Sequence, residues 1–574
     1  MACARKLLAF EAGKGLSVLL SVCLPLCGFA QPKEWSYPPG IWSVWELDRA
    51  RAYMRDEGLR VRYDGRFREP VKAVEFRKGA DGVPFTVTAA YTYGVPCVPG
   101  TGYEARVRGE WLPNGDWRPC DVFATTGDLP PHRVGYEPTE LKPTMKDGLW
   151  DAGREVVAYV RCRSEKRPVF RVGESAPEAW SEDPAGFEQT CLAVPAGEQG
   201  VWKSHVPLAF RYVRFTTPVD GVTLVLDEPT LKPVRTFTGG TARERRIWDV
   251  SAETLRLCSR HFYVDAVKRD RLPWAGDLAV SLLSSSASFR DGQTVRNSLD
   301  VLDCGDPRDE VNGIVDYSDW WVICHALYRR HFDDLAFTRS RWSSICQRTD
   351  SLMRLADEDG FIRGTNAWLF IDHGVGGNSN LGPRTTPLNI LQYAALTKAA
   401  DLADELGERT AAARWRGQAA TLRANIRRAA FDPVRGLFRC DVFDAASPFR
   451  RHANFLAILF GVAEKDECAR IAGELAKDEM PEVGTTWMSA IECVALLLHG
   501  HRDEVSRRIE SVWGGMLDRG ATTFWESWQP MRKGDAVYGF YGRPFGLALC
   551  HTTSTGPLFL LPMLYEKTPR NPFE

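Results

Sequence analysis

One stretch of this 574-residue chain gathers the residue types that acid–base chemistry requires. Residues 265–277 contain three cations, the indole of Trp274 and three carboxylates, Asp265, Asp270 and Asp277. A proline and a glycine interrupt regular structure there, and helix-like sequence lies on both sides. Charged groups on a loop that helices hold in place are typical of a catalytic site. A solvated surface turn is the alternative, but such turns seldom contain a tryptophan.

Three further segments combine carboxylates with aromatic residues in the same way. They span residues 316–321, 368–374 and 521–528, and His551 follows the last of them. Each segment alone has a structural explanation, because Asp319 could cap a helix and tryptophans pack in cores. Together they provide a set of candidate functional side chains: Trp320, Trp368, Asp372, Trp525, Glu526 and His551.

This set of residues fits glycoside hydrolysis. That reaction needs one carboxylic acid to protonate the leaving oxygen and one carboxylate to act as base or nucleophile. Asp270 and Glu526 lie far apart in the sequence, so a closed fold can bring them face to face across a pocket. Arg269 and Arg271 favour the ionised form of Asp270, so its role as the acid requires burial or nearby carboxylates. The chain also contains 19 Trp, and flat aromatic rings commonly line sugar sites.

The second half of the chain must hold these loops, and its pattern is helical. From Ala242 onward we expect about twelve helical segments, separated by short loops that carry Gly, Pro or Asp. Apolar residues recur at helical spacing most clearly over 388–406, 488–498 and 505–516. Short connections predict helical hairpins closed into an (α/α)6 toroid. A helical solenoid is the rival fold, but no motif repeats at a fixed period. Residues 265–277 then form the loop between the first and second helices, at the rim.

The first half of the chain is predicted to be β-rich. This pattern predicts a β-sandwich region over residues 31–240, built as one or two β units. A catalytic barrel is expected to follow over residues 241–574. Turn residues separate the strand-like segments, which lie at 71–76, 85–89, 156–162, 208–215 and 222–226.

Residues 1–30 have the features of a secretory signal peptide. Cations precede an apolar run at 16–26, and small residues precede a cleavage position after Ala30. The apolar run is too short to favour a membrane span. We therefore expect a periplasmic or extracellular protein, without membrane insertion once the signal is removed.

Composition argues against several other functions. The formal net charge of −1 gives no electrostatic case for binding nucleic acid. The 15 Cys are scattered without a CxxC pair, and no metal-ligand cluster or nucleotide-binding loop occurs, so we expect no metal and no cofactor. Buried thiols and a small number of disulfides are both compatible with this pattern. The expected partner is an oligosaccharide or polysaccharide substrate, and the oligomeric state is left open.

Two motifs resemble one known family. The sequence DAVKRDRLPWAGD at 265–277 resembles the signature loop DxxxRDERLGWxGD of the α-L-rhamnosidases of glycoside hydrolase family 78. The sequence TTFWESW at 522–528 is similar to their second motif, TTxWExW, whose Glu is the general base. His551 matches a histidine that contacts the sugar. The resemblance implies a β-sandwich ahead of an (α/α)6 barrel, hydrolysis with inversion, and Glu526 as the base.

The first motif is one carboxylate short of the family pattern. Where the family has Arg-Asp-Glu-Arg, this chain has Arg-Asp-Arg at 269–271, and the missing Glu is the family's general acid. Counted back from Trp274, Asp270 takes the place of that Glu; counted forward from Asp265, it matches the preceding Asp. We expect Asp270 to be the acid and Glu526 to activate water. The predicted substrate-binding residues are Asp265, Arg269, Trp274, Asp277, Trp320, Trp368, Asp372, Trp525 and His551.

Three functions are compatible with these residues. The leading hypothesis is a secreted, exo-acting glycoside hydrolase of the α-L-rhamnosidase type, which removes a terminal α-linked sugar. A toroidal glycosidase that acts on uronic acids is the second, because Arg269, Arg271 and Arg543 would favour an acidic sugar if they face the pocket. A sugar-binding protein that has lost its general acid is the third.

Overall fold

The computed structural model describes residues 139–574 with gaps, and six strands before them. The gaps are residues 184–188, 190, 192, 205–206, 261, 270, 272, 304–309, 364–367, 374–383 and 478. Residues 1–30, the predicted signal peptide, lie outside the described residues. The early strands form the sheet β3-β2-β4-β5 and the pair β1-β6. Their bounds are β1 Lys33–Glu34, β2 Val71–Lys78, β3 Phe85–Thr88, β4 Tyr103–Gly109, β5 Arg118–Pro119 and β6 Ala124–Thr125.

An antiparallel sheet precedes the helices, and we call it the β unit (residues 139–226). Its centre is the 15-residue strand β9, which pairs with β8, β12, β13 and β14. Alternating residues such as Val156, Ala158 and Val160 are buried against Phe210 and Leu224, so one face of the sheet holds an apolar core. The strands are β7 Thr139–Leu141, β8 Thr144–Lys146, β9 Leu149–Arg163, β10 Phe170–Gly173, β11 Ala193–Pro195, β12 Val201–Ser204, β13 Leu208–Phe215 and β14 Asp220–Leu226. A short helix, α3 (Ala176–Trp180), follows β10.

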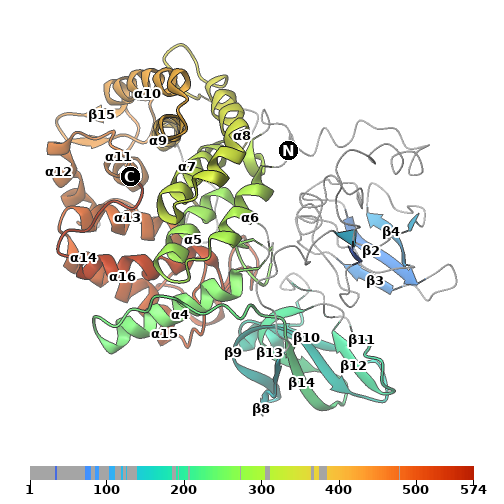
Figure 1. The fold of residues 1–574 in the computed structure, drawn as a ribbon. Helices are drawn as coiled ribbons and strands as arrows, with labels where there is room; N and C mark the ends of the chain where they lie inside the picture. The colour runs from blue at the N-terminus through green and yellow to red at the C-terminus, as the bar shows by residue number, and fades with distance from the viewer. Residues whose placement is uncertain are drawn as a thin grey trace.

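The helices of the second half form two rings (Figure 1). The inner ring closes on itself, because its members contact one another in chain order and the last contacts the first. Most inner-ring residues are buried, as expected for helices surrounded by protein. Within the described residues the inner helices are α5 Ala275–Ala287, α7 Val315–Phe332, α9 Thr385–Leu406, α11 Arg451–Leu459, α13 Thr486–Leu498 and α16 Pro557–Tyr565.

The outer ring supplies the first helix of each hairpin. In α10, buried residues such as Trp415, Leu422 and Ile426 alternate with exposed arginines, which is the pattern of a helix with one face in the core. The outer helices are α4 Ala242–Cys258, α6 Gly292–Leu302, α8 Leu335–Met353, α10 Arg409–Ala430, α12 Lys465–Leu475 and α14 Arg502–Ile509, which continues through the π-helical turn η3 (Glu510–Gly514) into α15 (Gly515–Asp518). The hairpin β15 (Phe431–Asp432) and β16 (Leu437–Phe438) follows α10.

The predicted toroid is confirmed, and one local prediction is wrong. The helices expected at 388–406 and 488–498 are α9 and α13, and residues 265–274 do join α4 to α5, although residues 275–277 already form the first turn of α5. Asp319 is not an N-cap, because α7 already begins at Val315. Among the described residues, the longest helices are too polar to cross a membrane and the apolar ones too short.

Candidate active site

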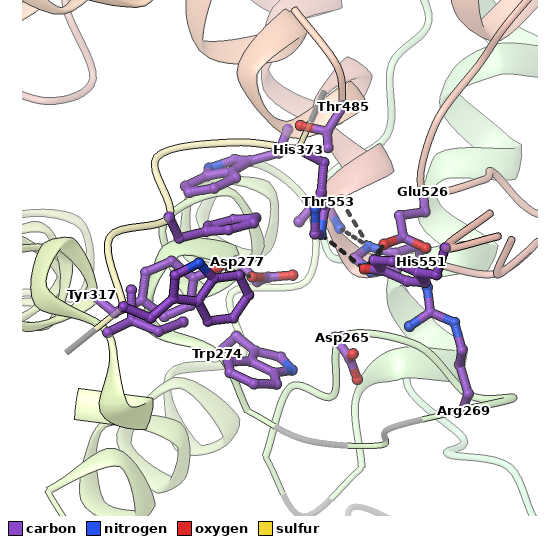
Figure 2. A pocket seen from close by; sticks show the side chains of 15 residues that line it. Asp265, Arg269, Trp274, Asp277, Tyr317, His373, Thr485, Glu526, His551 and Thr553 are labelled. Atoms are coloured by element: carbon purple, nitrogen blue, oxygen red, sulfur yellow. Dashed lines mark hydrogen bonds and ion pairs between the residues drawn. The ribbon is translucent and has the colours of Figure 1, made fainter. Parts of the chain in front are cut away.

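A pocket lies where the loops between outer and inner helices meet. Figure 2 shows Trp274 and Tyr317 on one side, Glu526, Arg269 and His551 on the other, and Asp265 and Asp277 between them. Five of the six hairpins contribute to this wall within the described residues. The full lining is Asp265, Arg269, Trp274, Asp277, Ile314, Tyr317, Trp368, Phe370, His373, Thr485, Trp487, Glu526, Tyr541, His551 and Thr553.

Backbone pairing holds the polar side of the pocket together. Ala266 and His551 form an isolated antiparallel bridge, and the N–H of Thr552 donates to the carbonyl of Asp265 at 2.7 Å. The N–H of Glu526 donates to the carbonyl of Ala548 at 3.1 Å. Hydrogen bonds between backbone groups therefore connect three segments that are far apart in sequence: residues 265–266, the second motif at 522–528, and residues 548–552.

Glu526 is buried, and its carboxylate has three polar side chains around it. Arg269 forms an ion pair with its Oε2 atom, and the Tyr541 hydroxyl donates to Oε1 at 3.0 Å. Since that hydroxyl hydrogen is committed to Glu526, Nε2 of His373 donates to the Tyr541 oxygen at 2.8 Å. Nε2 of His551 lies 4.0 Å from Oε1. The carboxylate is thus oriented from both ends.

The electrostatics of this cluster keep Glu526 ionised. Burial raises the pKa of Glu526, but Arg269, His551 and His373 outweigh it and lower the pKa to about 2. Burial lowers the pKa of His551 to about 4, although Glu526 opposes the shift. At neutral pH the site therefore contains an anionic Glu526 beside a neutral His551.

Tyr541 and Gly546 have backbone features that the site requires. Tyr541 has a φ of 51°, which is uncommon for a residue other than glycine, asparagine or aspartate. The Arg269 guanidinium lies 4.8 Å from the centre of its ring. The carbonyl of Gly546 accepts from Nε of Arg269 at 2.8 Å, and a Cβ at Gly546 would lie 2.3 Å from the carbonyl of Phe540. This turn thus needs glycine to present its carbonyl to Arg269.

Aromatic rings form the other side of the pocket. Tyr317 makes edge-to-face contacts with Trp274 at 6.0 Å and with Trp487 at 6.2 Å, and Phe370 stacks on Trp487 at 6.1 Å. Gly276 permits this packing, because a Cβ there would lie 2.6 Å from Trp487. A polar side with an anion and an apolar, aromatic side can bind the two faces of a sugar ring.

The structure brings most of the predicted site residues together. Seven of them line the pocket: Asp265, Arg269, Trp274, Asp277, Trp368, Glu526 and His551. Asp270 lies outside the described residues, so its prediction as the general acid stays a prediction.

Three predicted substrate-binding residues lie behind the pocket wall. Trp320 is fully buried on α7 and packs on Trp487, 5.9 Å between ring centres. Trp525 is buried and packs on Trp528, 5.6 Å between ring centres. Asp372 is fully buried; it accepts from the Thr485 hydroxyl at 2.7 Å and contacts His452 at 2.8 Å. For these three the prediction is corrected: they are buried behind the wall and do not line the pocket, where Trp320 and Asp372 contact the wall residues Trp487 and Thr485.

Eight other residues line the pocket but were not predicted: Ile314, Tyr317, Phe370, His373, Thr485, Trp487, Tyr541 and Thr553. Tyr317 and His373 belong to segments that the sequence did single out, so there the segment was predicted correctly but the side chain that faces the pocket was not. Trp487, on the first turn of α13, carries no motif around it. A tryptophan at the N-terminus of an inner helix is the signal that could have found it.

Within the described residues, no group of three or more His, Cys, Asp or Glu side chains is arranged to hold a metal ion.

The pKa of Glu526 predicts a pH-dependent stability. Its folded value of about 2 lies below the ordinary value of 4.5, so the carboxylate stabilises the fold above about pH 4.5 and this contribution is lost as the pH falls toward 2. We expect the free energy of unfolding of the wild type to exceed that of Glu526→Gln by about 3 kcal/mol at neutral pH. At pH 3 this difference should be smaller. Thermal unfolding of both proteins across this range measures the excess; an excess independent of pH contradicts the pairing.

Comparison with known proteins agrees with this architecture. A family model described as the bacterial alpha-L-rhamnosidase 6 hairpin glycosidase domain matches residues 234–544, more than half of the chain. The search of curated proteins returned no match.

Two solved structures have a similar fold. A rhamnosidase from Klebsiella oxytoca with rhamnose bound is 19% identical with a TM-score of 0.61, covering 91% of this chain and 99% of that one. A GH78 family rhamnosidase of Bacillus sp. GL1 is 16% identical with a TM-score of 0.64, covering 93% of this chain and 70% of that one. Taken with the family-model match, the fold and the pocket place this chain in the bacterial α-L-rhamnosidase six-hairpin glycosidase family, whose members are glycoside hydrolases.

Proposed function

We propose that this glycosidase is an exo-acting α-L-rhamnosidase that hydrolyses a terminal α-linked rhamnosyl residue with inversion. The observation that carries the proposal is the position of Glu526: a buried, ionised carboxylate that faces an aromatic wall across the pocket. Glu526 would accept a proton from the attacking water, and Asp270 would protonate the leaving oxygen.

The low pKa of Glu526 constrains the order of events. A carboxylate with a pKa of about 2 is a weak base, so it orients the water first. Proton transfer follows as the glycosidic bond breaks, because the oxocarbenium-like centre makes the attacking water strongly acidic. Arg269 and Tyr541 hold the carboxylate in place during this step.

The charges that face the pocket favour a neutral sugar over a uronic acid. Arg269 is paired with Glu526. Arg271 turns toward the β unit, where it donates to the carbonyl of Pro207 at 3.3 Å. Arg543 is not among the residues of the pocket wall. Two carboxylates, Asp265 and Asp277, are on that wall, and they suit hydroxyl donors and repel an anionic substrate.

Product analysis tests the proposal. We expect rhamnose release from α-L-rhamnosides, with the β-anomer formed first in the proton NMR spectrum, as inversion requires. Glucuronate release instead would support the second hypothesis. Sugar binding by calorimetry without product release from any glycan would support a binding protein.

Trp274 is expected to contribute to substrate binding. Trp274→Ala removes a ring from the pocket wall, so we expect KM to rise about tenfold, the equivalent of roughly 1.4 kcal/mol. Trp415→Phe is the matched control, since this buried tryptophan lies on the outer helix α10; it is expected to lower the thermal midpoint with KM unchanged. A Trp274→Ala enzyme with wild-type KM contradicts the assignment.

We also propose that the protein is exported, with residues 1–30 as signal peptide, 31–240 as the β-sandwich region and 241–574 as the catalytic barrel. The cations and apolar run before Ala30 support the first division. Mass spectrometry of the secreted protein tests it, and a mature chain that retains residues 1–30 would exclude cleavage.

A further inference from the structure

A buried lysine connects the pocket to the β unit. Lys268, directly before Arg269, is 3% exposed. Its ammonium lies 3.0 Å from Oε2 of Glu174 and 3.2 Å from Oε1 of Glu178. Glu174 follows β10 and Glu178 lies on α3, so both carboxylates belong to the β unit. The loop that carries Arg269 is therefore held partly from outside the toroid.

The same lysine contacts the irregular segment, residues 545–547, that binds Arg269. Lys268 donates to the carbonyls of Phe545 and Leu547, both at 2.9 Å, while Arg269 takes the carbonyl of Gly546 between them. Glu174 accepts from the N–H of Leu549 at 2.7 Å. Lys268 and Arg269 thus contact three consecutive carbonyls of one irregular segment, and these contacts fix both side chains against it.

Burial makes these contacts sensitive to the loss of either partner. Glu174 and Glu178 are 4% and 6% exposed. Burial raises the pKa of Glu178 to about 7, and Lys268 is the largest group that opposes the rise. A buried ammonium left without carboxylates must lose its proton or move to water. Either response releases Lys268 from residues 545–547.

From these contacts we infer that Glu174 and Glu178 of the β unit are positioning residues for the active site. These two carboxylates hold Lys268. Lys268 and Gly546 in turn hold Arg269, which orients Glu526. This inference rests on the proposed function, in which Glu526 is the base. The β unit is thus part of the catalytic apparatus and not a separate attachment to the toroid.

The double variant Glu174→Gln/Glu178→Gln tests the inference in the full-length chain. We expect kcat on an aryl α-L-rhamnoside to fall about 10- to 100-fold, with KM changed less than about twofold. The acidic limb of kcat/KM should move to higher pH. Glu526 is faced by Arg269, His373, Tyr541 and His551, and without Arg269 its burial is less opposed. The single variant Glu178→Gln, which retains Glu174, should show a smaller change of the same kind and serves if the double variant does not fold.

A second junction contact provides the matched control. Glu253 on α4 contacts Arg154 of β9 at 3.3 Å, so this ion pair also joins the β unit to the toroid, but away from the pocket. Glu253→Gln should lower the thermal midpoint and leave kcat and the acidic limb unchanged. Two outcomes would overturn the inference and leave these residues with a role in stability alone. The first is that Glu253→Gln lowers kcat as much as the Glu174/Glu178 variants do. The second is that the Glu174/Glu178 variants lose kcat while the acidic limb of their pH profile stays where it is in the wild type.

A crystal structure of the variant separates this inference from the proposed function. We expect the Arg269–Glu526 ion pair to be broken in it, and an intact pair overturns the positioning role whatever the enzyme hydrolyses. A wild-type protein that releases no rhamnose would instead refute the proposed function, and the ion pair in the variant would still decide the positioning role.

Discussion

Glu526→Gln is expected to lower kcat by about 10²- to 10⁴-fold, the range that general acid–base catalysis contributes. The amide keeps the size of the side chain and the hydrogen bond from Tyr541, but it cannot accept a proton from water. KM should change much less, because the aromatic side of the pocket is untouched. The measurement is steady-state hydrolysis of an aryl α-L-rhamnoside.

Glu467→Gln is the control for this variant. Glu467 on α12 pairs with Arg427 at 2.7 Å and lies on the outer ring, so its replacement removes an Arg–Glu pair without reaching the pocket. It should retain wild-type kcat. If Glu526→Gln retains more than about a tenth of the wild-type kcat, Glu526 is not the base.

Asp270→Asn is expected to have the second large effect, and that effect should depend on the leaving group. An acid that protonates the glycosidic oxygen matters most when the leaving group is a sugar alcohol and least when it is an acidic phenol. We expect a loss of about 10²- to 10⁴-fold on a rhamnosyl disaccharide, and a clearly smaller loss on a nitrophenyl rhamnoside. The ratio of the two losses is the diagnostic quantity.

The two neighbouring carboxylates are the matched comparison. Asp265, in the loop, and Asp277, in the first turn of α5, both line the pocket, so Asp265→Asn and Asp277→Asn remove similar charge at similar depth. They should raise KM and lower activity on both substrates alike. If one of them shows the leaving-group dependence and Asp270→Asn does not, that residue is the acid and Asp270 is displaced from the role.

These comparisons matter because the family's general acid, a glutamate, has no counterpart of the same length in this chain. Asp is one methylene shorter than Glu, so an Asp acid requires the backbone to come closer to the glycosidic oxygen. The contacts of Arg271 and Lys268 with the β unit hold the loop on both sides of Asp270. A loop whose backbone is held by contacts on both sides is suited to keep the shorter Asp side chain close to the glycosidic oxygen.

Much of the fold could be predicted because its signals are local. Apolar residues at helical spacing specify α9 and α13, and alternation specifies β13. Short loops between helices limit the arrangements to hairpins of neighbouring helices. The exact start of α7 could not be predicted in the same way, because its first turn contains Asp316, which looks like a loop residue. Asp316 is tolerated there because its carboxylate accepts from the N–H groups of Phe370 and Ile371 at 2.8 and 3.1 Å.

The candidate site was predictable only at the level of segments. Spacing in the sequence cannot show which way a side chain points from an irregular loop. Trp525 and Glu526 are adjacent, yet one packs in the core and the other faces the pocket. Tyr541 could not be predicted as a pocket residue because it lies in no recognisable motif.

By itself the sequence determined the class of fold and the loops that carry the chemistry, since these follow from periodicity and from residue types at short spacing. The resemblance of TTFWESW to a family motif implied Glu526 as the base. Only the tertiary structure decided which side chains share the pocket, that Arg269 is paired with Glu526, and that Lys268 ties this pair to the β unit. These relations join residues up to hundreds of positions apart. They depend on how closed rings of helices bring loops together, and on burial that makes each charge require a partner.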